Sequence, residues 1–200
     1  MKKLTALTSI LVLLLAGIAF AQVDADPDGL GVYFDTNGIE TCFTTVAPFE
    51  SVTGYLLLTN PSDSFGISGW EANIDVLGAA VAPAWTLAAG LDVDMSAAGF
   101  QVGIGTDALA LPVAPAVVLA TWVGFIMAPT DIVSFVISNV AGSSSFPSNP
   151  GYASGSNAGV LIPLQVSSGY PYGAPAAQIN ACDVVANEDM SFSNVKNLFR

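Results

Sequence analysis

The chain has 200 residues, with 16 acids, four basic residues and no histidine, and its formal net charge is −12. So acidic a chain repels phosphate backbones and anionic lipid, which argues against nucleic-acid binding and polybasic membrane docking. The lack of histidine excludes a Ser-His-Asp triad, a Cys-His pair and an HExxH zinc site. Carboxylate pairs of the glycosidase type remain possible, but no spacing marks two of the acids as such a pair.

The N-terminal segment is typical of a signal peptide. Two lysines precede a nearly continuous apolar run over residues 4–20, and Ala19-Phe20-Ala21 supplies the small-x-small cleavage pattern. We therefore expect residues 1–21 to be removed, leaving Gln22 as the N-terminus of an exported protein. The alternative is an uncleaved membrane anchor, because the apolar run is just long enough to span a bilayer. No cysteine follows the run to carry a lipid.

Cleavage leaves two basic residues against sixteen acids, which gives a net charge of −14. The new N-terminus begins with an acidic lead over residues 22–29. In this lead Asp24, Asp26 and Asp28 precede a glycine with the D-x-D-x-D-G spacing of a calcium loop, and Asp35 falls at the twelfth position. We expect a solvated acidic lead instead, because Pro27 stiffens the segment and the next residues have a strand pattern. We therefore expect no cofactor, with calcium as the alternative.

Strand patterns then follow at short spacing, punctuated by glycine and proline, without a sustained helical period. The segment Asn37-Gly38 predicts a hairpin between the first two strands. We expect strand fragments and loop over residues 78–90, and one long loop over residues 141–158. The expected strands cover residues 30–35, 40–46, 52–60, 67–77, 100–104, 116–127, 132–139 and 159–167. This pattern predicts an all-β, two-sheet antiparallel sandwich of the jelly-roll or Ig-like kind over residues 30–182.

Aromatic residues offer a second kind of candidate site, a stacking platform for sugar rings. Strand alternation places Trp70 on an apolar face, and Trp122 lies in a run that is apolar on both faces, so we expect both in the core. Trp85 and the turn with Tyr170 and Tyr172 are the better candidates for exposure and for ligand binding.

The two cysteines, Cys42 and Cys182, are expected to form a disulfide, because both lie in the exported chain. In the loop-entropy model, closing so long a segment contributes about 4–5 kcal/mol. The alternative is two buried free thiols.

Two parts of the sequence resemble cohesin-like domains. The segment SVTGYLLLTNPSDSFGISGWEANIDV, which ends at Val76, is similar to their first strands, and VVLATWVGFIM followed by DIVSFVISN looks like their two long central strands. The resemblance covers about residues 30–168 and implies a jelly-roll-like sandwich similar to cohesins and carbohydrate-binding modules. No dockerin-binding residue can be matched. The chain is also similar to uncharacterised secreted bacterial proteins that open with a G-φ-Y-F-D strand, here residues 31–35.

The C-terminal tail, residues 183–200, has a different composition from the body. A serine can cap a short helix there, and acids before it and cations at its end suit the helix dipole. We expect a frayed terminus that packs its aromatics on the domain, the alternative being a docking or sorting element. Its candidate contact residues are Phe192, Val195, Lys196, Leu198, Phe199 and Arg200.

These features predict a secreted, non-catalytic structural or protein-interaction module in the periplasm, on the cell surface or in the medium. The expected partner is another secreted or cell-surface protein. We expect the chain to bind no nucleic acid and, after cleavage, no membrane. A carbohydrate-binding module that uses exposed aromatics is the alternative. A glycosidase-type enzyme ranks third.

Overall fold

The computed structural model of the chain describes residues 26–94, 96, 98–167 and 172–182, and this part is nearly all β-structure. The all-β prediction is therefore confirmed, whereas the expected signal helix and C-terminal helix lie outside the described residues. One short 3-10 helix, η1 (Asp107–Leu109), precedes β8. In chain order the strands are β1 (Gly29–Tyr33), β2 (Cys42–Phe43), β3 (Glu50–Thr59), β4 (Ile67–Gly78), β5 (Ala80–Leu87), β6 (Leu91–Asp92), β7 (Gly99–Gly103), β8 (Ala116–Ile126), β9 (Val133–Ser138), β10 (Gly151–Ser154), β11 (Leu161–Pro163), β12 (Gln165–Val166) and β13 (Pro175–Ile179).

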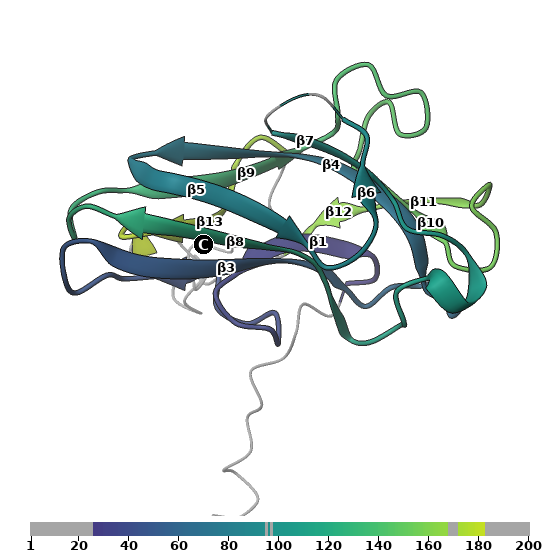
Figure 1. Cartoon of the computed structure of the whole chain (residues 1–200), viewed down its shortest axis with the longest axis horizontal. Helices are drawn as coiled ribbons and strands as arrows, with labels where there is room; N and C mark the ends of the chain where they lie inside the picture. The colour runs from purple at the N-terminus through teal and green to yellow at the C-terminus, as the bar shows by residue number, and fades with distance from the viewer. Residues whose placement is uncertain (1–25, 95, 97, 168–171, 183–200) are drawn as a thin grey trace, which may run out of the picture.

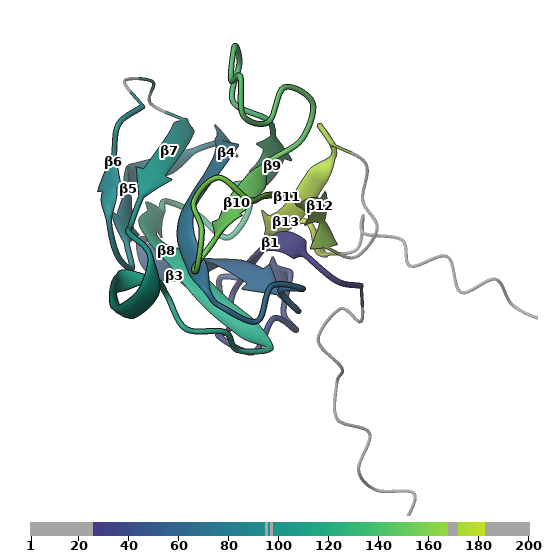
Figure 2. The same ribbon diagram turned by 90° about the vertical axis from the view of Figure 1, so that its right-hand side faces the viewer.

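The strands form two sheets that face each other as in a β-sandwich (Figures 1 and 2). The first sheet has the order β12-β1-β3-β8-β5. The second has the order β11-β10-β4-β9-β13-β2, with β7 on the other side of β4 and β6 beside β7. The chain passes between the sheets several times, for example at the tight turn from β4 to β5.

Both sheets are mixed, so the prediction of wholly antiparallel sheets is wrong. The strand β1 pairs with β12 in parallel, and β13 pairs with β2 in parallel. The single strand expected over residues 159–167 is divided, because β11 belongs to the second sheet and β12 to the first. Between them, the Leu164 N–H donates to the Pro150 carbonyl (2.9 Å) and the Leu164 side chain is buried.

The hairpin expected at Asn37-Gly38 does not form. The turn itself exists, since Gly38 has a φ of 74° and the Asp35 carboxylate accepts the N–H groups of Asn37 (2.6 Å) and Glu40 (2.6 Å). However, β1 pairs with β3, and β2 pairs with β13 in the opposite sheet. The turn therefore carries the chain from one sheet to the other.

The core lies between the sheets and consists of the inward-facing residues that strand alternation predicts. Trp122 is fully buried and meets Phe135 edge-to-face, with ring centroids 5.0 Å apart. Trp70 is 3 % exposed and packs on Phe100 at 5.5 Å. The prediction that both tryptophans belong to the core is confirmed. Apolar burial of this kind contributes roughly 25 cal/mol per Å², and within the described residues no salt bridge can assist it, because all four basic residues lie outside them.

The disulfide between Cys42 and Cys182 is confirmed, with Cα atoms 5.4 Å apart. It joins β2 to the residues after β13 and so closes a loop of 140 residues. Across the described ranges, no helix has the length and apolar character needed to cross a membrane.

Candidate functional site

One end of the sandwich carries a cluster of exposed hydrophobic side chains. The register places Glu50 of β3, Ile126 of β8 and Ala80 of β5 side by side in the first sheet. In the second sheet the row at this end joins Gly78 of β4, Val133 of β9, Ile179 of β13 and Phe43 of β2. Because only Ala79 separates Gly78 from Ala80, the two rows lie at the same end of the molecule.

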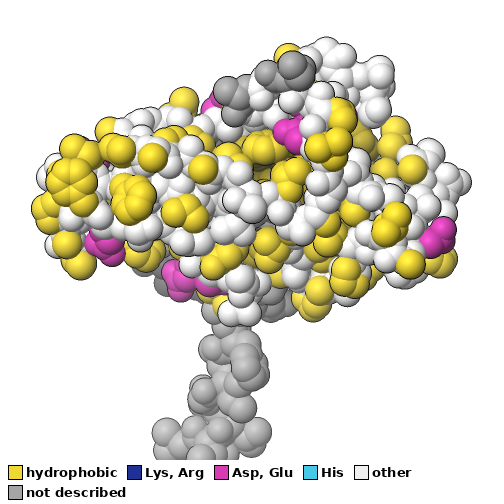
Figure 3. Space-filling view, viewed as in Figure 1, with side chains coloured by type: hydrophobic (Ala, Val, Ile, Leu, Met, Phe, Trp, Pro, Cys, Tyr) yellow, Lys and Arg dark blue, Asp and Glu magenta, His cyan; other side chains and the backbone are white. Residues whose placement is uncertain are grey.

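Next to these rows lie seven large apolar residues with exposed side chains, which we call the end patch. Figure 3 shows hydrophobic side chains gathered at the left end of the molecule, over the ends of β5 and β8, with acidic side chains toward the margins of the view. Exposed apolar side chains that gather at one place on a soluble protein can mark an interaction site. The members of the end patch are Val46, Phe49, Leu77, Val81, Phe125, Met127 and Ile132.

Phe49 is the most unusual member of the end patch. Its side chain is 64 % exposed and its backbone is left-handed, with a φ of 59°. A bulky residue is rarely found in this conformation, which costs about 1–2 kcal/mol. The adjoining turn holds it in place, because the Glu50 carboxylate accepts the N–H groups of Val46 (2.8 Å) and Ala47 (3.2 Å). The fold thus maintains a strained turn that presents an aromatic ring to solvent.

The loops that carry the end patch are tied to one another. The Thr45 N–H donates to the Asn180 side-chain carbonyl (2.8 Å), and the Asn180 amide donates to the Asp131 carbonyl (2.9 Å). The Asp131 carboxylate in turn accepts the Ala128 N–H (3.0 Å). With the Cys42–Cys182 disulfide nearby in sequence, these bonds tie the patch loops together, and the carboxylates of Glu50 and Asp131 lie in the same loops.

The exposed face of the first sheet continues from the end patch without a charged residue. The outward residues of β3, β8 and β5 form three cross-strand rows: Ser51–Phe125–Val81, Thr53–Val123–Ala84 and Tyr55–Thr121–Thr86. The edge strand β5 is interrupted between Val81 and Ala84, where Ala82 has a φ of 48° and Pro83 lacks an N–H. A bulge and a proline protect an edge from pairing with another strand. The face is therefore a better docking surface than the edge.

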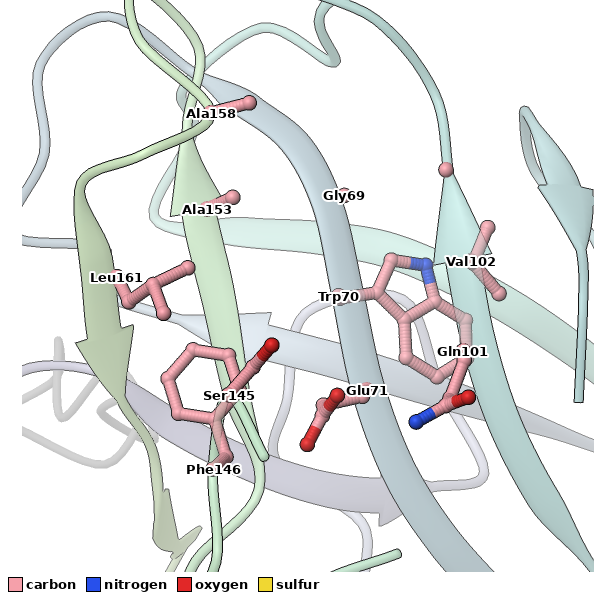
Figure 4. A pocket seen from close by; sticks show the side chains of 11 residues that line it. Gly69, Trp70, Glu71, Gln101, Val102, Ser145, Phe146, Ala153, Ala158 and Leu161 are labelled. Atoms are coloured by element: carbon pink, nitrogen blue, oxygen red, sulfur yellow. The ribbon is translucent and has the colours of Figure 1, made fainter. Parts of the chain in front are cut away.

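A cleft of about 240 Å³ lies on the outer side of the second sheet, far from the end patch (Figure 4). Gln101 of β7 and Glu71 of β4 line it, and they belong to a cross-strand row that continues to Gly151 of β10. The loop over residues 140–150 folds back over this row, and the Phe146 ring occupies the space above Gly151. The Ser143 hydroxyl donates to the Glu71 carboxylate and accepts the Phe146 N–H (3.1 Å).

A groove of about 250 Å³ opens between the two sheets and contains one of the sequence-predicted residues, Trp85. Trp85 is only half-buried, and it meets Phe100 and Phe135 edge-to-face at 5.9 and 6.4 Å. It is therefore part of the core margin and does not form an open platform. Asp75 and Trp122 line the same groove.

The other predicted aromatics form no platform in the described structure. Tyr172 is 38 % exposed, its hydroxyl donates to the Leu164 carbonyl, and burial raises the pKa of its phenol. Tyr170 lies outside the described residues, as do the tail residues Phe192, Val195, Lys196, Leu198, Phe199 and Arg200. The end patch was missed because its members come from three separate stretches of the chain, residues 46–49, 77–81 and 125–132, and no local pattern marks them.

The calcium loop does not assemble among the residues that are described. Asp28 and Asp35 lie at opposite ends of β1, because the intervening chain is an extended strand, and Asp35 caps its own turn. The Asp28 carboxylate instead accepts the Tyr152 hydroxyl (2.9 Å) and the Ser62 N–H (2.7 Å). Asp24 lies outside the described residues, and Asp26 precedes β1. Within the described ranges, no group of three or more His, Cys, Asp or Glu residues can hold a metal.

No family model, curated protein or solved structure matches this chain.

Proposed function

We propose that the protein is a secreted, non-catalytic interaction module that docks another exported protein through the end patch. The observation that carries the proposal is the group of seven exposed apolar side chains at one end of the sandwich. Three of them lie near strand ends, and the other four, Val46, Phe49, Met127 and Ile132, lie in loops that hydrogen bonds tie together. Pre-ordered loops lose little entropy on binding, and a central aromatic such as Phe49 or Phe125 is a typical anchor of an interface.

The negative charge of the protein favours a partner with basic residues around its contact surface. The net charge, −14 after the expected cleavage, and the carboxylates of Glu50 and Asp131 in the patch loops favour a partner whose apolar contact area is rimmed by lysine or arginine. Export is part of the proposal and rests on the leader pattern, with the disulfide as its structural support. The cohesin-like, jelly-roll relationship also belongs to the proposal and rests on the sequence resemblance and on the two facing sheets.

The test compares partner capture and affinity between variants of the exported chain. Phe49→Ser and Phe125→Ser each remove an anchor, whereas Leu109→Ser removes an apolar side chain that is even more exposed (71 %) at the other end of the sandwich. A protein captured from the native secretome is purified and its Kd measured by calorimetry. We expect the two end-patch variants to bind the partner at least about tenfold more weakly than the wild type does. The affinity of the wild type should fall faster with added salt than that of a neutral interface. Equal losses for Leu109→Ser, or self-association as the sole binding, would contradict the proposal.

Carbohydrate binding is the second candidate, favoured by the position of Trp85 in the inter-sheet groove beside Asp75. A sugar ring can stack on the exposed part of the indole while the carboxylate accepts its hydroxyl groups. Tryptophan fluorescence titrated with soluble polysaccharides, with Trp85→Ala as the control, tests this candidate. No change in the spectrum across several glycans would dismiss it.

A further inference from the structure

The Glu71 cleft contains a carboxylate in an unusual environment. Glu71 is 7 % exposed although it lies on the outer face of β4, because the loop over residues 140–150 covers it. In Figure 4 its carboxylate points into the space between Ser145, Phe146 and the Gln101 side chain. The cleft and the end patch lie at different places along β4, so the two sites are independent.

No cation from the described part of the chain neutralises this carboxylate. All four basic residues, Lys2, Lys3, Lys196 and Arg200, lie outside the described ranges. The hydrogen bond that the structure gives to the Glu71 carboxylate comes from the Ser143 hydroxyl. A charge removed from water without a paired opposite charge is costly, so a cleft of this kind gains stability from a cation that enters it.

The lining of the cleft indicates which kind of cation fits. Glu71, Gln101 and Ser145 provide oxygen acceptors at one side, whereas Phe146, Leu161 and Val102 provide apolar walls. An apolar channel that leads to a carboxylate suits the methylene stem and charged end of a lysine or arginine side chain. A calcium ion needs six to eight oxygen ligands, and this cleft contains a single carboxylate.

We propose that the Glu71 cleft binds the ammonium or guanidinium end of a basic side chain, with its methylene stem along Phe146 and Leu161. Glu71 is the counter-ion, and Gln101 and Ser145 accept the remaining N–H groups. The chain has two basic residues after the expected cleavage, Lys196 and Arg200, so its own tail and a basic side chain of a partner are the two sources of this chemistry.

Titration of the mature chain with n-butylammonium and with butylguanidinium, followed by amide chemical shifts in NMR, tests the site. We expect saturable shifts at Glu71, Gln101 and Phe146, and none with n-butanol, which has the stem without the charge. Glu71→Gln keeps the size and the acceptor for Ser143, and should weaken binding about tenfold or more. Glu40→Gln, the same change at an exposed position, should leave binding unchanged.

A second variant covers the case in which Glu71→Gln perturbs the fold. Gln101 pairs with Glu71 across β4 and β7, so Gln101→Lys places an ammonium within the chain beside the carboxylate and should abolish binding of the free amine. Tighter amine binding to the Lys196→Gln/Arg200→Gln variant identifies the tail as the natural occupant, whereas unchanged binding identifies an external basic side chain. Equal binding to Glu71→Gln, or a response to calcium chloride but not to the amines, would overturn the proposal.

Discussion

Phe146 occupies the space that a side chain on residue 151 would need. A Cβ atom built on Gly151 overlaps the Phe146 ring, so this glycine allows the loop over residues 140–150 to close on the sheet. The loop then buries Glu71, which is its hydrogen-bond partner through Ser143. The absence of a side chain at residue 151 of β10 thus lets Phe146, which lines the cleft, take its position.

Gly151→Ala should displace the Phe146 ring and lower the free energy of unfolding by about 1–3 kcal/mol, the usual cost of overpacking. Urea unfolding measures the loss, and faster amide exchange in the 140–150 loop locates it. Gly103→Ala is the matched control, because a Cβ there has no atom within 4 Å. Similar losses in both variants would show that the close contact with Phe146 is not the cause.

Phe49→Asn should raise the free energy of unfolding by about 1 kcal/mol, because asparagine tolerates the left-handed backbone at a φ of 59° better than phenylalanine. The same variant should lose binding of the proposed partner, since it removes an anchor of the end patch. Thermal unfolding and calorimetry on one preparation measure both effects. A variant that is less stable than the wild type would refute the assignment of strain to this turn.

Burial raises the pKa of the Tyr152 phenol to about 12, and the hydrogen bond to the Asp28 carboxylate acts in the same direction. The folded state therefore holds this proton more tightly than the unfolded state. The resulting stabilisation is complete below about pH 10 and is lost as the pH rises from about 10 toward 12. Urea unfolding between pH 9 and 12 should show this loss in the wild type and a smaller one in Tyr152→Phe. Parallel pH profiles for the two proteins would contradict the assignment.

Replacement of both cysteines, Cys42→Ala with Cys182→Ala, should lower the free energy of unfolding by about 4–5 kcal/mol, because the disulfide closes 140 residues. Denaturant unfolding with and without dithiothreitol measures the effect. The reduced wild type should match the double variant. A reduced protein as stable as the oxidised one would show that β2 and the end of β13 hold together without the bond.

Local patterns in the sequence located most long strands but not their partners. Alternation around Trp70 predicted the bounds of β4 to within one residue, because a strand buried on one face alternates apolar and polar residues. The apolar run around Trp122 predicted β8, because a continuous apolar run rich in β-branched residues is typical of a strand. The strand β10 was expected to be loop, since Gly151-Tyr-Ala-Ser has little intrinsic strand preference and is stabilised by pairing with Trp70 and Glu71. Pairings such as β1 with β12 join residues more than 130 positions apart, and no local signal records them.

The candidate sites were harder to predict, for the same reason. The disulfide was predicted from two cysteines in a chain expected to be exported, and it is confirmed. The end patch joins Phe49 to Phe125 only through the register of β3 with β8. Among the described residues, the calcium spacing does not bring Asp28 and Asp35 together, because an extended strand separates them, and spacing alone does not reveal this.

The covalent link from Cys42 to Cys182 encloses β3 to β13 in one ring of polypeptide. A protease that cuts any single loop within this ring opens it but leaves both fragments joined through sulfur. Outside the cell, where proteases are common, such a nicked molecule keeps its two halves at high effective concentration and can remain assembled. On an electrophoresis gel it migrates as one band until a thiol reagent separates the pieces.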